Sequence, residues 1–289
     1  MLPCHLIEII TPKKFKLNGL WFGPKKSKRV IIFIHGLSSS AFSHSRADKW
    51  ADSKTAVITF SNRGHDKVTE IYPVKRGKKG SGGLLAGTAH EIFTDCVDDI
   101  QGAINFVRKT GIKDTYLAGH STGCQKSVYY ASKKATDIKG LILLAPMSDY
   151  AGILKMESPA RLARATKLAR TLVKKGKRHE LLPREIWPNI LDAQRFLSLY
   201  TPDSKEEIFS YIQPKKNPKA FTSVRLPMLV VLAQKDEHGN LSAEKIELWF
   251  RKHNKSRSLE TTIVPDALHS FTGLEKKVSI IVRRWLAHQ

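Results

Sequence analysis

The sequence predicts an α/β protein with a mostly parallel central sheet, flanking helices and an inserted helical segment. Strand-like apolar runs alternate with amphipathic segments over residues 29–145, as expected when helices connect parallel strands. The same alternation resumes at Pro227. Residues 146–222 break it with several X-Pro steps and a long amphipathic stretch. We therefore predict a core of residues 1–145 and 223–289, with residues 146–222 as a helical cap or lid over the carboxyl ends of the strands.

The predicted strands are short apolar runs, several of them rich in β-branched residues. Residues 29–34 form a continuous run of this kind, which suits a central strand buried on both faces. The Asn18-Gly19 pair is a hairpin-type dipeptide and predicts a break within residues 15–22. The full set of predicted strands covers residues 5–10, 15–22, 29–34, 55–60, 115–118, 138–145, 228–233 and 258–264.

The predicted helices have apolar residues at three- and four-residue spacing. Over residues 94–109 this spacing places Val97, Ile100 and Ile104 on one face. Residues 61–90 instead form a Gly- and Lys-rich segment, and a loop of that length inside a compact domain is usually functional or mobile. The other predicted helices cover residues 43–52, 124–134, 157–175, 242–252 and 271–288.

The composition fits a soluble globular protein, but the charge is unusual. The 289 residues are 41% hydrophobic and carry a formal net charge of +23. Such a charge can attract nucleic acid, an anionic membrane or an acidic substrate. The basic residues are spread along the chain without a zinc-finger pattern or an aromatic RNA-binding motif. We therefore expect a lysine-rich surface and no specific nucleic-acid partner.

Three features of the sequence bear on the cellular location. No run reaches the ~18 consecutive apolar residues of a membrane-spanning helix. The first residues lack the basic-then-apolar pattern of a signal peptide. Cys4, Cys96 and Cys124 are widely spaced, which predicts free thiols and offers no metal-ligand spacing. The sequence therefore predicts a cytoplasmic protein without a membrane span.

The most informative motif is Gly119-His120-Ser121-Thr122-Gly123, which lies between a predicted strand and a predicted helix. A sharp strand–turn–helix connection holds a serine hydroxyl clear of the sheet edge, where a substrate carbonyl can reach it. The flanking glycines let the strained turn close and let the helix pack on the strand. Ser121 is therefore the candidate nucleophile.

A serine hydroxyl needs a base within hydrogen-bond reach and a third group that orients the base. His269 and Asp236 each follow a predicted strand, so we expect both on the same rim of the sheet as Ser121. Glu237 and Asp266 are alternatives to Asp236, because one is its neighbour and the other lies three residues before the histidine.

An attacked carbonyl also needs two backbone N–H groups that stabilise its developing oxyanion. The expected donors are Thr122, directly after the serine, and Leu37, in the loop that follows residues 29–34. Gly36 lets this loop approach the serine closely. The candidate residues of the substrate pocket are His35, Gly36, His120 and Met147.

Together these residues resemble the α/β-hydrolase superfamily. The matching features are His35-Gly36, the Asn62–His65 stretch, the Gly119–Gly123 turn, Asp236 and His269. The overall layout is similar to capped carboxylesterases, including feruloyl-type esterases. The Gly-His-Ser-Thr-Gly-Cys-Gln run resembles a group of microbial and fungal hydrolases.

Two positions depart from the family pattern, and neither belongs to the catalytic set. Cys124 stands where many relatives have a second glycine, and Ser61-Asn62 where an aspartate often precedes the Arg-Gly-His turn. The resemblance implies a carboxylesterase-type serine hydrolase that cleaves carboxylic esters through an acyl-enzyme and needs neither a cofactor nor a metal. Its implied partner is a small-molecule ester with an apolar acyl or aromatic group.

Other activities stay open at this point. The same triad can cleave carbon–carbon bonds, thioesters or amides. A hydrolase scaffold can also serve as a non-catalytic binding protein, and the positive charge could serve to bind a polyanion.

Overall fold

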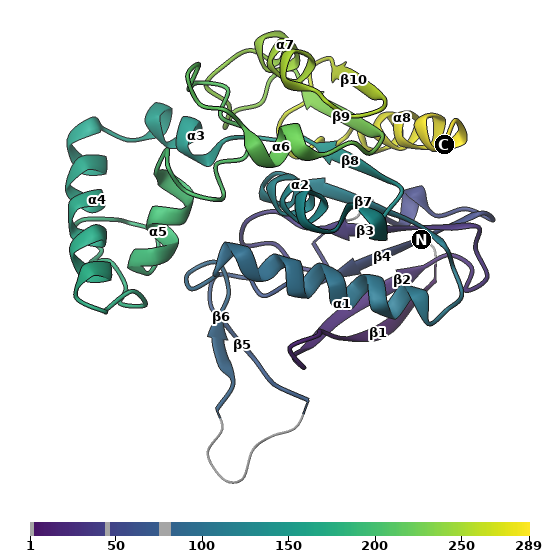
Figure 1. Cartoon of the computed structure of the whole chain (residues 1–289), viewed down its shortest axis with the longest axis horizontal. Coiled ribbons are helices and arrows are strands. Elements are labelled where there is room, and N and C mark those ends of the chain that lie inside the picture. The colour runs from purple at the N-terminus through teal and green to yellow at the C-terminus, as the bar shows by residue number, and fades with distance from the viewer. Residues whose placement is uncertain (1–2, 44–46, 75–81) are drawn as a thin grey trace.

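A single eight-stranded sheet forms the centre of the protein (Figure 1). The computed structural model describes residues 3–43, 47–74 and 82–289. The strands of the sheet are β1 (Cys4–Ile10), β2 (Lys16–Phe22), β3 (Arg29–Ile34), β4 (Thr55–Phe60), β7 (Asp114–His120), β8 (Gly140–Leu144), β9 (Met228–Ala233) and β10 (Leu259–Val264). Their order is β1-β2-β4-β3-β7-β8-β9-β10. Strand β2 is antiparallel to both of its neighbours, and the strands from β4 to β10 are parallel.

Strand register brings the carboxyl ends of the parallel strands to one edge. Ile34, the last residue of β3, pairs with Gly119 near the end of β7. Val264, the last residue of β10, pairs with Ala233 at the end of β9. The loops that follow these four strands therefore leave the sheet on the same side, where ligand sites of open α/β sheets lie.

Helices cover both faces of the sheet. Their bounds are α1 (Cys96–Arg108), α2 (Thr122–Lys134), α3 (Asp149–Met156), α4 (Pro159–Lys174), α5 (Ala193–Tyr200), α6 (Lys219–Ser223), α7 (Ala243–His253) and α8 (Glu275–Ala287), with short 3-10 turns η1 (Ala47–Trp50), η2 (Phe93–Asp95) and η3 (Ala135–Asp137). In β3, Val30 and Ile32 pack in one cluster with α1, α2, α6 and α7, whereas Ile31 and Phe33 face η1 and α8. This alternation is the two-residue period of a strand buried on both faces.

Residues 146–222 contain a hydrophobic cluster of their own. Its fully buried Trp187 and Phe196 pack edge to face, with ring centroids 4.8 Å apart. Leu37, in the loop after β3, packs against this cluster, whereas Phe221 on α6 packs in the cluster of the core. Figure 1 shows α4 and α5 lying together at one side of the sheet.

The predicted α/β class is confirmed, but three local predictions are wrong. Where a helix was predicted over residues 43–52, the described residues form only the 3-10 turn η1. Asn18-Gly19 does not turn, and β2 runs straight through it because the strand is paired on both edges. A Cβ at Gly19 would lie 2.5 Å from the carbonyl oxygen of Thr59, so the close strand approach explains the glycine. The last helix begins at Glu275, since Phe271 has a φ of 54° that no α-helix accommodates.

The segment 61–90 contains a small hairpin. Strands β5 (Thr69–Ile71) and β6 (Leu84–Ala86) pair antiparallel. Residues 75–81 of the same segment lie outside the described residues.

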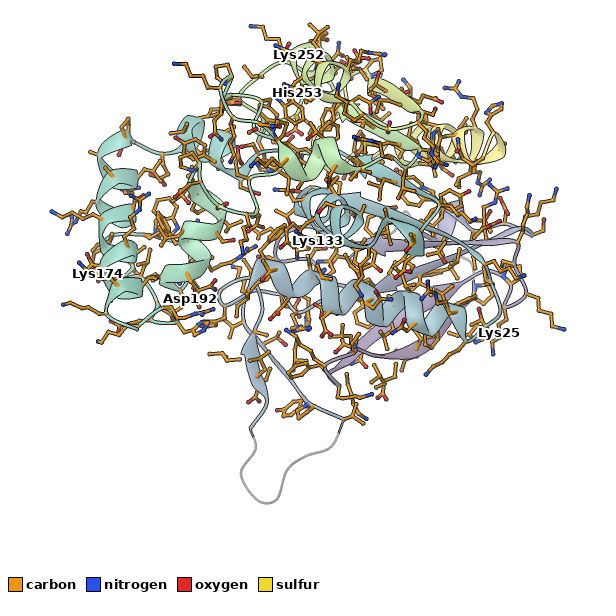
Figure 2. The ribbon with its side chains drawn as sticks, viewed as in Figure 1. Lys25, Lys133, Lys174, Asp192, Lys252 and His253 are labelled. Atoms are coloured by element: carbon orange, nitrogen blue, oxygen red, sulfur yellow. The ribbon has the colours of Figure 1, made fainter. Side chains whose placement is uncertain are left out.

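Figure 2 shows exposed lysines in several separate parts of the described structure. Figure 2 labels Lys25, Lys133, Lys174 and Lys252, which are exposed and lie far apart on different elements. Among the helices of the described ranges, none has the length and apolar character needed to cross a bilayer.

Candidate active site

Ser121 occupies a strained turn between β7 and α2. Its backbone has φ 54° and ψ −126°, a conformation that non-glycine residues adopt only where the surroundings enforce it. The neighbouring glycines explain how the turn fits. A Cβ at Gly119 would lie 2.3 Å from the carbonyl oxygen of Gly123, and a Cβ at Gly123 would lie 2.1 Å from that of Ile34. The motif therefore folds as a sharp elbow with the serine at its apex.

His269 and Asp236 form a hydrogen-bonded pair beside this elbow. His269 Nδ1 lies 2.8 Å from Asp236 Oδ2, and both side chains are largely buried. The His269 ring is 5.0 Å from the ring of His120, the residue before the serine, and His120 Nε2 contacts the His269 carbonyl oxygen at 2.9 Å. The imidazole is thus held next to the turn by contacts on two sides.

The charge of Asp236 is stabilised in place. Burial alone would raise the pKa of this carboxyl, but the hydrogen bond from His269 and the nearby positive charge bring it below its ordinary value. The Asp236 Oδ1 atom also accepts the backbone N–H of His238 at 3.0 Å. The carboxylate is therefore ionised and oriented toward Nδ1, which leaves Nε2 free to act as a base.

The two alternative acids do not contact the imidazole in this way. Glu237 Oε2 accepts the backbone N–H of His269 at 2.8 Å and so positions the loop. Asp266 is exposed and pairs with Lys235 at 2.7 Å. Among the three carboxylates considered, Asp236 has the geometry of the orienting acid.

The Ser121 hydroxyl itself is turned toward Met147. Its Oγ lies 3.6 Å from the methionine sulfur, and both residues are buried. Within the described residues, Ser121 and His269 make no side-chain hydrogen bond with each other. Catalytic hydrogen bonds often form only when substrate is bound, and a χ1 rotation redirects the hydroxyl. Met147, a predicted pocket residue, is thus in direct contact with the candidate nucleophile.

The two predicted oxyanion donors lie on either side of the serine. Thr122 begins α2, where N–H groups have no intrahelical partner and the helix dipole favours negative charge. Gly36 approaches so closely that a Cβ there would lie 3.0 Å from the Ser121 Cβ and 3.6 Å from its Oγ. Leu37 follows in the same loop, and in the described ranges neither its N–H nor that of Thr122 donates a hydrogen bond to protein.

His35 fixes the loop that carries Gly36 and Leu37. Its Nε2 accepts the backbone N–H of Asn62 at 3.2 Å, so the proton of the neutral ring is on Nδ1, which lies 2.8 Å from the Gly36 carbonyl oxygen. His35 is fully buried, and the contacts of its two ring nitrogens hold this loop against Asn62.

Sequence patterns did not predict a buried ion network beneath the elbow. Lys126 on α2 contacts Glu91 at 2.5 Å, Glu91 contacts Arg195 on α5 at 2.8 Å, and Arg195 contacts Glu206 at 2.5 Å. All four side chains are almost completely buried. Nearby, burial raises the pKa of Asp149 to about 8, and the charge of Glu206 adds to this rise. The network connects α2, the helix that follows Ser121, to the inserted segment.

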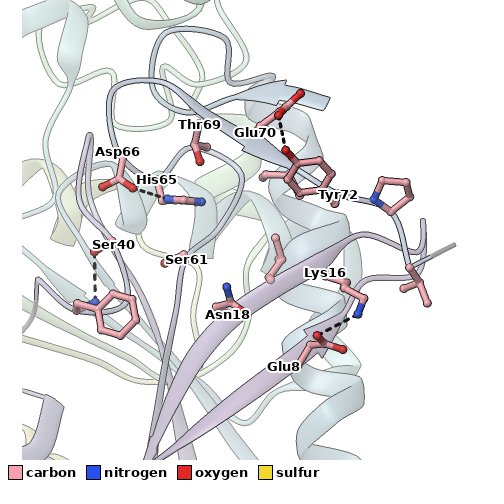
Figure 3. Close-up of a pocket in the computed structure, with 15 residues that line it drawn as sticks. Glu8, Lys16, Asn18, Ser40, Ser61, His65, Asp66, Thr69, Glu70 and Tyr72 are labelled. Carbon is pink, nitrogen blue, oxygen red and sulfur yellow. Dashed lines mark hydrogen bonds and ion pairs between the residues drawn. The ribbon is translucent and has the colours of Figure 1, made fainter. Parts of the chain in front are cut away.

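A cavity of about 900 Å³ with a mixed polar and apolar lining lies elsewhere, between the ends of β1 and β2 and the β5–β6 hairpin. Figure 3 shows its lining, in which His65 pairs with Asp66 and Lys16 pairs with Glu8. None of Ser121, His269 and Asp236 lines it. The predicted catalytic residues therefore lie outside this cavity.

Comparison with solved structures shows the fold. The chain is similar to the siderophore hydrolase EstB from Aspergillus fumigatus, with a TM-score of 0.71 and 16% identity over 100% of this chain and 98% of EstB. It is also similar to Est1E from Butyrivibrio proteoclasticus, solved with ferulic acid bound, with a TM-score of 0.66 and 16% identity over 98% of each chain. A third similar structure is the Pyrococcus furiosus esterase Pf2001, with a TM-score of 0.61 and 18% identity over 99% of this chain and 91% of Pf2001. At these identities the likeness establishes the α/β-hydrolase fold.

Sequence comparison gives one curated relative and one family. A Mycoplasma genitalium protein named "Putative esterase/lipase 2" is 31% identical over 130 residues, which span 44% of this chain and 41% of the relative. Residues 87–288 match the family described as "Protein of unknown function (DUF1749)". This match covers the elbow, both candidate partners of Ser121 and the whole helical insertion. The chain is therefore a member of the DUF1749 family, built on the α/β-hydrolase fold.

Proposed function

We propose that this protein is a serine hydrolase that cleaves carboxylic esters through an acyl-enzyme intermediate. The observation that carries the proposal is the placement of the His269–Asp236 pair, joined at 2.8 Å, beside the strained Ser121 turn. A nucleophile, a base and an ionised acid that orients the base are the three parts of this kind of nucleophilic ester cleavage. The esterase named among the sequence relatives supports the same class of reaction.

The proposed reaction has two halves. His269 Nε2 takes the Ser121 proton as Oγ attacks the ester carbonyl carbon, and the oxyanion forms between the N–H groups of Leu37 and Thr122. Collapse breaks the bond to the alcohol oxygen, which receives the proton from His269 and leaves. Water, deprotonated by His269, then attacks the acyl-enzyme. Collapse breaks the bond to Ser121 Oγ, which takes the proton back from His269, and the acid is released. Asp236 stabilises the imidazolium in both halves.

We further propose that residues 146–222 act as a cap over this site. Three contacts support this role. Met147 touches Ser121, Leu37 packs against the insertion's cluster, and Arg195 reaches Glu91 in the buried ion network. The apolar Met147 side chain lies directly against Ser121, which supports a small ester with an apolar acyl or aromatic group as the substrate. The free cysteines, two of them buried, favour the cytoplasm.

Active-site labelling tests the proposal. Wild type, Ser121→Ala and the matched control Ser132→Ala, which changes a serine elsewhere on α2, are treated with a fluorophosphonate and assayed on p-nitrophenyl esters of increasing acyl length. We expect labelling and turnover in wild type and control, and neither in Ser121→Ala. Equal labelling of all three proteins would refute the nucleophile. Labelling of Ser121 with turnover only of thioesters or amides would keep the nucleophile and overturn the ester assignment.

A further inference from the structure

One group of potential metal ligands stands out among the described residues. His90, His179 and Asp192 each direct one ligand atom to a common point, and these atoms lie within 4.8 Å of one another. Nδ1 of His90 is 3.0 Å, and Nδ1 of His179 is 2.9 Å, from the same Asp192 oxygen, Oδ2. None of the three belongs to the proposed catalytic set.

The three ligands come from segments that are distant in the sequence. His90 follows β6 in the core, His179 follows α4, and Asp192 directly precedes α5 in the insertion, where Figure 2 labels it. The backbone N–H of Asp192 donates to the carbonyl oxygen of Ala89 at 2.9 Å. Backbone contacts therefore hold the core ligand and the insertion ligands together, so the cluster is pre-organised.

The two oxygens of Asp192 have separate partners. Oδ1 accepts the backbone N–H of Arg195 at 2.7 Å and caps α5, which leaves Oδ2 facing both imidazoles. Asp192 and His90 are buried, whereas half of the His179 side chain is exposed. An ion and a water ligand can therefore reach the cluster from solvent.

We propose that His90, His179 and Asp192 bind a divalent transition-metal ion, with Zn²⁺ as the best fit. We also propose that the bound ion stabilises the contact between the helical insertion and the core. Two imidazoles, one carboxylate and an open fourth position suit zinc. Tetrahedral bonds of ~2.0–2.1 Å place ligand atoms about 3.3 Å apart, so the two nitrogen-to-Oδ2 distances of 3.0 and 2.9 Å widen by only a few tenths of an ångström. All three ligand atoms lie within 4.8 Å of one another, so the two imidazole nitrogens approach each other by at most about 1.5 Å, and the half-exposed His179 side chain has room to move. When the ion binds, it takes the place of the protons in the hydrogen bonds between the two Nδ1 atoms and Asp192 Oδ2.

Metal binding to tag-free protein tests the site. The protein is stripped with EDTA, desalted and titrated with Zn²⁺ against a chromogenic chelator. We expect one ion per chain with a Kd of about 1 µM or lower, and visible absorption bands of a tetrahedral site when Co²⁺ is used instead. His179→Ala, which removes a half-exposed ligand, should raise the Kd by about 100-fold or more. Asp192→Asn should do the same while keeping the helix cap, since asparagine caps as well as aspartate.

The matched control is His65→Ala. His65 pairs with Asp66 at 2.8 Å in the same Nδ1-to-carboxylate geometry, but no third ligand joins them in the described ranges. We expect this variant to bind zinc as wild type does. If wild type binds zinc no more tightly than His179→Ala, the cluster is a hydrogen-bonded His–Asp–His contact and the proposed metal site is wrong.

Hydrogen exchange tests separately whether the ion stabilises the contact between the insertion and the core. Zinc should slow amide exchange in residues 176–194 of wild type and should have no such effect in His179→Ala. At about 100-fold excess over the Kd, zinc should also raise the Tm of wild type by about 4 °C. Tight zinc binding with unchanged amide exchange in residues 176–194 would show that the ion does not stabilise the contact between the insertion and the core.

Discussion

The imidazole Nδ1 of His269 lies 2.8 Å from the Asp236 Oδ2, and this contact joins the loops that follow β10 and β9. Because the two strands end in register, the pair is held on the same edge of the sheet as Ser121. In the proposed mechanism, Asp236 therefore sets the tautomer and the orientation of the His269 imidazole.

Replacing Asp236 by asparagine should therefore abolish most of the activity. An amide at this position can donate to Nδ1 and stabilises the wrong tautomer, so we expect kcat for ester hydrolysis to fall by ~10⁴. Glu237→Gln is the control, because the Glu237 carboxylate contacts the His269 backbone N–H and the His238 ring but makes no hydrogen bond to the His269 imidazole, and its loss of rate should stay within about 10-fold. Comparable losses in the two variants would argue against Asp236 as the orienting acid.

The elbow should not tolerate a side chain at Gly123. A Cβ there would lie 2.1 Å from the Ile34 carbonyl oxygen, so Gly123→Ala should lower the free energy of unfolding by about 3 kcal/mol or more, or prevent folding. At Gly239 the nearest atom to a Cβ is 3.5 Å away, and Gly239→Ala should cost less than about 1 kcal/mol. Urea denaturation measures both, and equal stabilities would contradict the close approach.

Breaking the buried ion network should be costly. Lys126→Met removes one of the two cations that contact the buried Glu91. We expect the free energy of unfolding to fall by about 3–5 kcal/mol. Lys134→Ala, at the exposed end of the same helix, should stay within about 0.5 kcal/mol. Adding Glu91→Gln to Lys126→Met should recover part of the loss, and a strictly additive double variant would show that the two side chains are not coupled.

Stability should also depend on pH through the acids near this network. Burial raises the pKa of Asp149 to about 8 and that of Glu207 to about 7. The folded state therefore keeps protons that the unfolded chain releases near its ordinary carboxyl pKa, and these groups reduce stability as pH rises toward 8. Asp149→Asn should make the Tm fall less steeply than wild type between about pH 5 and pH 8, the range between the ordinary carboxyl pKa and the raised pKa of Asp149. An identical slope in both proteins would show that Asp149 titrates normally.

Features that depend on residues close together in the sequence were mostly predicted correctly. The buried strand at residues 29–34 and the glycine-framed turn at Ser121 both depend on neighbouring residues, and the structure has them where the sequence predicts them. The Asn18-Gly19 prediction was wrong because pairing on both edges of β2 outweighs a turn preference. Sheet pairing of that kind is not visible in the dipeptide.

Contacts between distant segments were not predictable in this way. Lys126 and Arg195 meet at Glu91, and His90 meets Asp192 across 102 positions, without any regular spacing that marks them. The lack of a metal-ligand spacing in the sequence therefore carried little information about His90 and His179. Such clusters become visible only when the insertion is placed against the core.

Peptide mass spectrometry of the fluorophosphonate-treated protein tests the central claim most directly. The account predicts one covalent phosphonate per chain, located on Ser121, and its loss when His269 is replaced by alanine. Modification at another residue, or full labelling of Ser121 in the His269→Ala variant, would contradict it.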